Sequence, residues 1–265
     1  MVTSPPDAGP IAAEADLANS PLGGRPELAG QTVAVIGGSA GIGFATAQRA
    51  RAAGADVIVT GRDSERLAAA AADLEAVDSA AFDATDADAL DRFFGSLPST
   101  VHHIMLSAGR PYYGPLDEFD FAMAERDVAE HIWLPIRVAR HAARTLPPGG
   151  TLLLIGGTGA RRPTRGTVMI TTLTVALPAL TQALAVELAP IRVNLIACGF
   201  VDTPLSASLL GDHLDERRDQ LRQTLPIRRV VQPDDVGALA VHLMANTALT
   251  GATYDIDGGQ QLLTS

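Results

Sequence analysis

The segment from Thr32 to Gly43 constrains the fold most, because it reads as a buried strand that runs into a glycine-rich turn and a helix. Its first part, TVAVIG, is a short β-branched apolar run, and its second part spaces Gly37, Gly41 and Gly43 as G-x-x-x-G-x-G. Glycines permit a tight bend and close backbone approach to a pyrophosphate, and the helix that follows offers free N–H groups and a positive dipole end. The pattern predicts a strand–turn–helix unit that binds a dinucleotide.

Further apolar runs follow this unit, and helical segments separate them. The other predicted strands are 55–61, 80–82, 102–109, 151–157, 191–199 and 252–259, and the predicted helices are about 42–53, 64–74, 119–146 and 167–189, with one more after Asp86. Continuous apolar strands that alternate with helices are typical of a parallel sheet covered on both faces. We therefore predict one Rossmann-type, doubly wound α/β domain over residues 27–265, with a mainly parallel seven-stranded sheet.

Composition restricts the remaining possibilities. Residues 1–26 are rich in Pro, Ala, Gly and Ser, which predicts a flexible N-terminal arm, with packing against a neighbouring subunit as the alternative. The net charge of −10 argues against nucleic acid or an anionic membrane as the main partner, and we expect no membrane-spanning segment. The single cysteine, Cys198, rules out an internal disulfide framework and fits a reducing cytoplasm. We expect a soluble cytoplasmic protein without a metal site.

The end of the second predicted strand bears on which dinucleotide binds. An acidic residue there would accept a hydrogen bond from the adenosine ribose 2′-OH and select NAD. This chain has Gly61 followed by Arg62, and a guanidinium suits a 2′-phosphate, which favours NADP(H) over NAD(H). A solvated Arg62 is the alternative. Asp83, at the end of the third predicted strand, is placed to accept from the adenine amino group.

These segments together resemble the short-chain dehydrogenase/reductase family, from about Leu28 to Leu262. The glycine loop is similar to the family's T-G-x-x-x-G-x-G, with Ile36 in place of Thr. Ser107-Ala108-Gly109 is similar to the family's N-N-A-G, with Ser for the second Asn. The family's R-V-N, P-G-x-V-x-T and D-G-G landmarks resemble residues 191–194, 198–204 and 257–259, where Cys198 replaces Pro.

The resemblance implies an NADP-dependent oxidoreductase that acts on a small carbonyl or alcohol as a homodimer or homotetramer. It also implies a mobile substrate lid at about 204–225 and contact between Thr203 and the cofactor. The full set of predicted cofactor-binding residues is Gly37, Ser39, Gly41, Ile42, Gly43, Arg62, Asp83, Ser107, Ala108, Gly109 and Thr203.

The residues of the family's proton relay are missing. The family uses a Ser to orient the substrate, a Tyr to donate the proton, a Lys four residues later to lower the Tyr pKa, and an Asn to complete the relay. Alignment on Val175-Ala176-Leu177 places these four positions at Gly157, Ile170, Thr174 and His131. The chain contains no lysine, since its twenty basic residues are all arginine. The usual relay is therefore absent.

Several side chains are candidates to replace the proton relay or to bind the substrate. His131 is the predicted substitute acid or base, because an imidazole titrates near neutrality; a packed or surface histidine is the alternative. Tyr112 and Tyr113 follow the fourth predicted strand, where they could form a wall for an apolar substrate. Thr158 could bind a carbonyl or cap a helix. Arg161 and Arg162, with the nearby Arg110 and Arg165, could hold an anionic substrate, or they form a solvated loop.

Three functional hypotheses follow. The first is an NADP(H)-dependent oxidoreductase with a substituted or missing proton donor. The second is a non-redox enzyme (an isomerase, cyclase or dehydratase) that uses the same pocket. The third is a catalytically silent cofactor-binding subunit.

Overall fold

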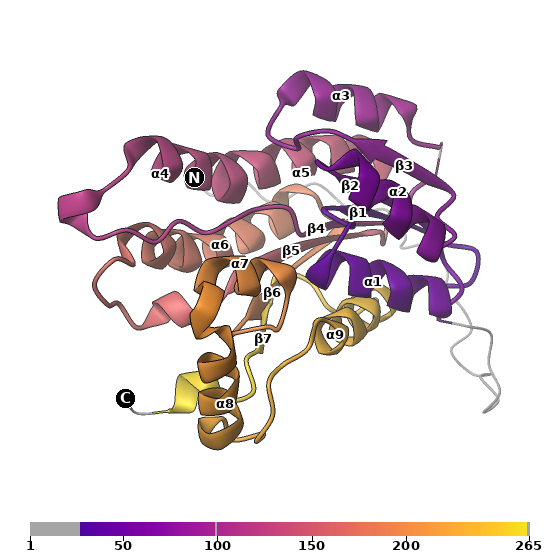
Figure 1. Cartoon of the computed structure of the whole chain (residues 1–265). Coiled ribbons are helices and arrows are strands. Elements are labelled where there is room, and N and C mark those ends of the chain that lie inside the picture. The colour runs from indigo at the N-terminus through magenta and orange to yellow at the C-terminus, as the bar shows by residue number, and fades with distance from the viewer. Residues whose placement is uncertain (1–26, 99, 264–265) are drawn as a thin grey trace, which may run out of the picture.

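A computed structural model describes residues 27–98 and 100–263, so the predicted arm at 1–26 lies outside the described residues. Seven parallel strands form one sheet in the order β3-β2-β1-β4-β5-β6-β7, shown in Figure 1. The strands are β1 (Thr32–Ile36), β2 (Asp56–Gly61), β3 (Asp78–Ala81), β4 (His103–Leu106), β5 (Thr151–Gly157), β6 (Arg192–Cys198) and β7 (Thr253–Ile256). This confirms the predicted sheet, and the strand order reverses between β1 and β4, where doubly wound folds bind their ligands.

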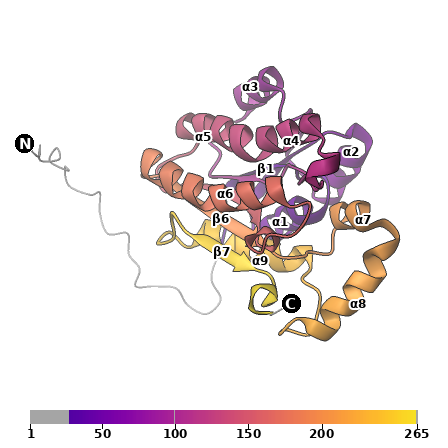
Figure 2. The same ribbon diagram turned by 90° about the vertical axis from the view of Figure 1, so that its left-hand side faces the viewer.

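Helices cover both faces of this sheet, as the sequence predicted (Figure 2). One face packs on α1 (Gly41–Ala52), α2 (Ser64–Asp73) and α9 (Pro233–Ala245), and the other on α3 (Ala87–Ser96), α5 (Leu134–Thr145) and α6 (Val168–Glu187). The strands supply the centre of both cores, because their Val, Ile and Leu side chains are almost fully buried. Between and after these elements, the described residues also form short 3₁₀ turns at Leu116–Glu118, Gly159–Arg161, Gly211–His213 and Gln260–Leu262.

The long helix predicted at 119–146 is divided into three consecutive parts. It consists of α4 (Phe121–Val128), a π-helical turn η2 (Ala129–Trp133) and α5. Pro135, in the first turn of α5, explains the interruption, because proline has no N–H for the carbonyl four residues earlier and its ring clashes with that carbonyl. That carbonyl belongs to His131. A widened turn relieves this conflict, and such π turns often occur at functional sites.

Helix α6 corrects one expectation, that no segment is long and apolar enough to cross a membrane. Over 18 residues its mean hydropathy is 1.6, and only 22% of that window is buried. By length and composition alone this one helix passes the test for a membrane span, which is weak evidence. Here α6 packs along β5 and β6, and its exposed side includes Val175 and Val186.

The segment predicted as a substrate lid forms two helices, α7 (Pro204–Leu210) and α8 (Leu214–Thr224). They are drawn in orange and extend from the body of the molecule in Figures 1 and 2. Arg218 of α8 forms a two-pronged ion pair with Asp202, with nitrogen–oxygen distances of 2.7 and 3.0 Å. This pair joins the far helix of the segment to the residue before Thr203. The mobility of the segment stays a prediction.

Candidate active site

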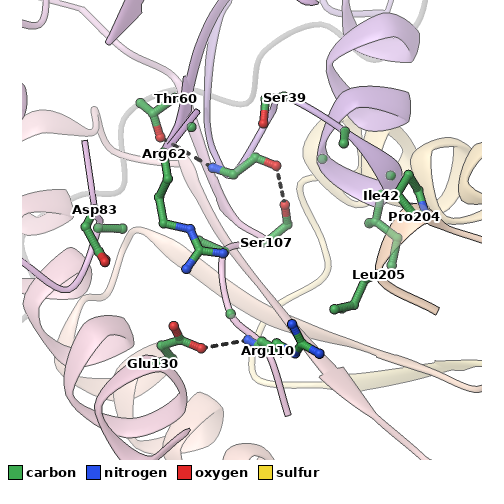
Figure 3. Close-up of a pocket in the computed structure, with 18 of the residues that line it drawn as sticks. Ser39, Ile42, Thr60, Arg62, Asp83, Ser107, Arg110, Glu130, Pro204 and Leu205 are labelled. Atoms are coloured by element: carbon green, nitrogen blue, oxygen red, sulfur yellow. Dashed lines mark hydrogen bonds between the residues drawn. The ribbon is translucent and has the colours of Figure 1, made fainter. Parts of the chain in front are cut away.

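A cavity of about 350 Å³ opens at the carboxyl ends of β1, β2 and β4. Figure 3 shows it enclosed by the turn after β1, the ends of β2 and β4, the π turn η2 and the start of α7. The eleven residues predicted to bind the cofactor all contribute to its lining: Gly37, Ser39, Gly41, Ile42, Gly43, Arg62, Asp83, Ser107, Ala108, Gly109 and Thr203. The structure thus brings together residues that lie up to 166 positions apart (37 to 203).

The glycine turn is shaped for close backbone approach. A Cβ on Gly43 would lie 2.1 Å from the Gly37 carbonyl oxygen and 2.4 Å from Oγ of Ser107, so no other residue fits there. Gly37 has a φ of +96°, a backbone conformation that residues other than glycine rarely adopt. The Ser107 hydroxyl donates to the Gly37 carbonyl at 3.0 Å. Ser107 therefore braces the loop from beneath, as Figure 3 shows.

The start of α1 is free to bind an anion. Its N-cap residue, Ala40, provides no side-chain hydrogen bond. By contrast, Asp63, Asp86 and Asp120 cap α2, α3 and α4 through their side chains. The first N–H groups of α1 therefore keep their donor capacity, and the positive end of the helix dipole favours a phosphate at this place.

Two arginines lie at the β2 end of the cavity. Arg62 follows β2 and Arg66 lies in the first turn of α2, and both are exposed and line the cavity. In the described part of the chain neither forms an ion pair. The sequence reasoning missed Arg66, and the signal that could have found it is a second arginine at the start of the helix that follows β2.

Asp83 is held in a fixed orientation at the β3 end. One oxygen accepts from the backbone N–H and the hydroxyl of Thr85, at 3.0 and 2.7 Å, and the other accepts from Arg126 at 3.0 Å. Burial acts to raise the Asp83 pKa, but these hydrogen bonds outweigh it and the pKa is lowered. The carboxylate is therefore charged and oriented at the cavity wall.

Arg126 also connects Asp83 to a buried carboxylate that the sequence reasoning missed. Arg126 donates from Nε to Glu130 at 2.9 Å, and Glu130 is only 5% exposed. The other Glu130 oxygen accepts from the backbone N–H of Arg110 at 2.7 Å. Glu130 thus holds the chain directly after Gly109, on the cavity floor (Figure 3).

His131 lies behind that floor. Its Nδ1 lies 3.0 Å from the backbone oxygen of Asp127 and 2.7 Å from that residue's Oδ1. A Cβ on Gly109 would be 3.3 Å from Nε2 of the imidazole. The ring is 15% exposed and the Asp127 carboxylate is fully buried. The structure therefore places the predicted acid beside the turn that closes β4.

Comparison with known proteins agrees with this geometry. The family model for enoyl-(acyl carrier protein) reductase matches residues 37–261. Dehydrogenase/reductase SDR family member 4 of Pongo abelii is 30% identical, over 92% of each chain. This chain belongs to the short-chain dehydrogenase/reductase family.

Two further relatives extend this result. Short-chain dehydrogenase/reductase malC of Malbranchea aurantiaca is 28% identical over 90% of this chain and 97% of its own. Its solved structure, described as a reductase/Diels-Alderase, superposes with a TM-score of 0.81 over 90% and 99% of the two chains. A small-chain dehydrogenase solved with NADPH is 25% identical and superposes with a TM-score of 0.75 over 88% and 99%.

In this short-chain dehydrogenase/reductase, the positions that the resemblance assigns to Ser, Tyr and Lys carry no proton relay. Gly157 ends β5, and a Cβ there would meet only the Cys198 carbonyl at 3.8 Å, so the space for a side chain is empty. Ile170 is half-buried in the first turn of α6. Thr174, one turn later, is 4% exposed, and within the described residues its hydroxyl has no hydrogen-bond partner.

The hypothesis of an anion-binding arginine rim is not supported. Arg161 pairs with Asp255 at 2.5 and 2.7 Å, and Arg165 pairs with Asp117 at 2.6 and 2.8 Å. Arg162 donates to backbone carbonyls near the C-terminus, those of residues 261 and 263. Because these guanidiniums are engaged within the chain, they are not free to converge on a substrate. Only Arg110, of the four proposed, lines the cavity.

Other substrate-pocket predictions also need correction. Tyr112 is buried, and its phenol oxygen accepts from the Asp120 N–H at 2.7 Å, so it braces the loop and offers no wall. Thr158 is fully buried and donates weakly to the Cys198 carbonyl at 3.4 Å. Tyr113 remains available, with 54% exposure. Cys198 is a buried filler, and burial raises the pKa of its thiol to about 12.

Proposed function

We propose that this protein is an NADP(H)-dependent oxidoreductase that acts on a small carbonyl or alcohol. The observation that carries the proposal is the combination of an uncapped α1 N-terminus with two unpaired arginines at the β2 end of the same cavity, within the described residues. A pyrophosphate fits the first site, and a 2′-phosphate fits the second because a guanidinium forks around phosphate oxygens.

The neighbour solved with NADPH supports this choice of cofactor. Bound NADPH would supply a hydride, while the protein positions the reacting atoms. Ser107, Ala108 and Gly109 would lie under the nicotinamide ribose, and Asp83 would face the adenine. His131 is the proposed acid or base, because it is the titratable imidazole directly behind Gly109.

Calorimetry with NADPH, NADP⁺ and NADH tests the proposal directly. We expect micromolar binding of NADPH and at least tenfold weaker binding of NADH, a difference of about 1.4 kcal/mol. NADPH oxidation, followed at 340 nm with a panel of small aldehydes and ketones, then tests turnover. Failure of all three nucleotides to bind would disprove the cofactor assignment.

A second candidate function is non-redox chemistry in the same pocket, as an isomerase, cyclase or dehydratase. Two observations favour it. One is the relative described as a reductase/Diels-Alderase. The other is that Gly157 and Ile170, which have no proton-donating side chain, stand at the positions that the resemblance assigns to Ser and Tyr. Product formation without NADPH consumption would identify this function. Tight NADPH binding with neither kind of turnover would instead indicate a cofactor-binding subunit.

We further propose that a second copy of the chain covers α6. The helix exposes 64% of Val175 and 81% of Val186, and exposed apolar surface of this kind commonly marks an interface. Sedimentation equilibrium should report a dimer or tetramer. Replacement of both valines by glutamate should yield a soluble monomer, and an unchanged assembly would place the interface elsewhere.

A further inference from the structure

The pair of Asp127 and His131 has a geometry that the family's relay does not explain. Asp127 accepts the Tyr112 N–H on Oδ2 at 3.0 Å, while Oδ1 lies 2.7 Å from His131 Nδ1. The backbone oxygen of Asp127 lies 3.0 Å from the same nitrogen. The backbone oxygen is the hydrogen-bond partner of Nδ1, and Oδ1 lies close to the same nitrogen without a hydrogen-bond partner of its own among the described residues. Both oxygens favour the hydrogen on Nδ1, and Nε2 then faces Gly109.

We propose that Asp127 is a positioning residue that fixes His131 in its Nδ1–H form, so that Nε2 exchanges the substrate proton in the reaction assigned above. The inference rests on the proposed function for its substrate. Its geometry does not, because the contacts between Asp127 and His131 lie within the chain.

The π turn makes this arrangement possible. Asp127 lies in the last turn of α4 and His131 in η2, so the pair spans the point where the helix widens. The widening also turns Glu130 into the cavity wall, where it holds the Arg110 N–H. The imidazole is held on its Nδ1 side by Asp127, and an oriented ring loses little freedom when it reacts.

The charges around the imidazole favour its protonated form. Burial lowers the His131 pKa, but the hydrogen bonds and charge of Asp127, with the charge of Glu130, outweigh burial and raise it. Glu130 is partly balanced by Arg126. In the loop after β4, the backbone N–H groups of Arg110 and Tyr112 donate to Glu130 and Asp127, and the charge of Asp127 also acts on Tyr113. Helix α6 brings no charged side chain before Glu187. From α5, Arg137 donates to the Thr85 carbonyl.

The proton balance of the step is simple. In reduction, the carbonyl carbon gains a hydride and the oxygen takes the proton from Nε2 of the imidazolium. The Nε2–H bond breaks, an O–H bond forms, and the ring is left neutral with its Nδ1–H still directed at Asp127. Because 15% of the ring is exposed, a proton from water restores the imidazolium. Oxidation of an alcohol runs the same transfer in reverse.

Asp127→Asn tests the proposal, because it keeps the shape and removes the charge. We expect the His131 pKa, measured by NMR titration of its ring protons, to move to lower pH. The pH at which carbonyl reduction declines should shift down with that pKa, because the imidazolium is the proton donor. Relative to the unaltered protein, turnover should therefore fall more at pH 8 than at pH 6. The NADPH Kd should stay within twofold. His131→Asn assigns the ring signal by its disappearance.

A matched pair on the surface provides the control. His141 lies 2.9 Å from Asp91, which is 70% exposed. Asp91→Asn should change neither the His131 pKa nor the pH profile. If Asp127→Asn leaves both unchanged, the positioning role is wrong.

A measurement on the unaltered protein covers the case in which Asp127→Asn fails to fold. Nitrogen-15 shifts at high pH should show His131 protonated at Nδ1, and protonation at Nε2 instead would overturn the proposal. These shifts do not depend on turnover. A protein that shows the Nδ1–H form but binds no NADPH would therefore refute the proposed function while leaving the pair intact.

Discussion

The nucleotide end of the site, which is the cavity, and the reaction end behind the cavity floor are built from different materials. The nucleotide end consists mainly of backbone: glycines after β1, the free N–H groups of α1 and the bend at Gly109. The reaction end consists of side chains from α4, η2 and α6, which meet only in the folded protein. The first end follows from local steric rules and resembles the family's pattern, whereas at the second end the resemblance assigns the family's catalytic positions to Gly157, Ile170, Thr174 and His131.

This contrast shows which part of a fold can change while the rest is retained. A backbone site tolerates almost no substitution, since a Cβ on Gly43 would overlap the Gly37 carbonyl. A side-chain site can be replaced piece by piece, since a Cβ at Gly157 would meet only the Cys198 carbonyl at 3.8 Å and Ile170 is half-buried. Substitutions at the two ends should therefore fail in different ways.

The largest effect is expected at the nucleotide end. Gly43→Ala should weaken NADPH binding at least about 100-fold, or about 2.7 kcal/mol, because the loop must move to admit a methyl group 2.1 Å from the Gly37 oxygen. Calorimetry measures the loss. Gly95→Ala is the control, since its Cβ would meet nothing within 4 Å in α3, and it should stabilise the fold by roughly 0.5–1 kcal/mol.

At the reaction end, His131→Asn should reduce turnover and spare binding. Loss of a general acid typically costs about 10²–10⁴-fold in rate, and asparagine offers no titratable proton even though the family uses it at this position. We expect an unchanged NADPH Kd, measured by calorimetry beside steady-state kinetics. His141→Asn is the matched surface control. Unchanged turnover in His131→Asn would remove this residue from the mechanism.

The same difference explains what the sequence could predict. The parallel seven-stranded sheet follows from the apolar runs, and the glycine spacing pointed to the turn that lines the cavity together with the other predicted cofactor residues. The network of Asp83, Arg126 and Glu130 could not be predicted, because it joins the end of β3 to a helix about 45 residues later. The ion pairs of Arg161 and Arg165 could not be predicted either, because their partners, Asp255 and Asp117, are distant in sequence.

The π turn was missed for a different reason. A period of 3.6 residues continues through 119–146 on both sides of it, so the apolar pattern indicates one helix. The one local sign was Pro135, which reads equally well as a kink or as a helix start. Only the packed structure distinguishes these outcomes, and this is where Glu130 and His131 acquire their positions.

Cofactor selectivity should respond by a smaller amount. Arg62→Ala and Arg66→Ala are each expected to weaken NADPH binding about tenfold, since a charge-assisted hydrogen bond contributes about 1.5–3 kcal/mol, and to leave NADH binding unchanged. The double variant should lose less than the sum, because both arginines would share one phosphate. Arg222→Ala, in α8 and away from the cavity, is the control. Equal loss for NADPH and NADH would disprove a 2′-phosphate site.

The smallest expected effect concerns Thr174, the residue at the family's Lys position. Its buried hydroxyl has no partner among the described residues, so Thr174→Val should stabilise the fold by about 1 kcal/mol, or about 2–4 °C in Tm. Thr181 lies in the same helix, is fully buried and donates to the Leu177 carbonyl at 2.8 Å. Thr181→Val should therefore destabilise by about 0.5–1 kcal/mol.

Thermal unfolding of Thr174→Val and Thr181→Val, with and without NADPH, tests whether the reaction end helps to bind the cofactor. If the reaction end takes no part in holding the cofactor, both valine variants should gain the same stabilisation from saturating NADPH, about 2.7 kcal/mol at a hundredfold excess over Kd. A smaller gain in Thr174→Val alone would mean that its unpaired hydroxyl finds its partner in the bound cofactor. Thr174 would then retain part of the lysine's binding role, and the replacement of the family's reaction end would be incomplete at this position.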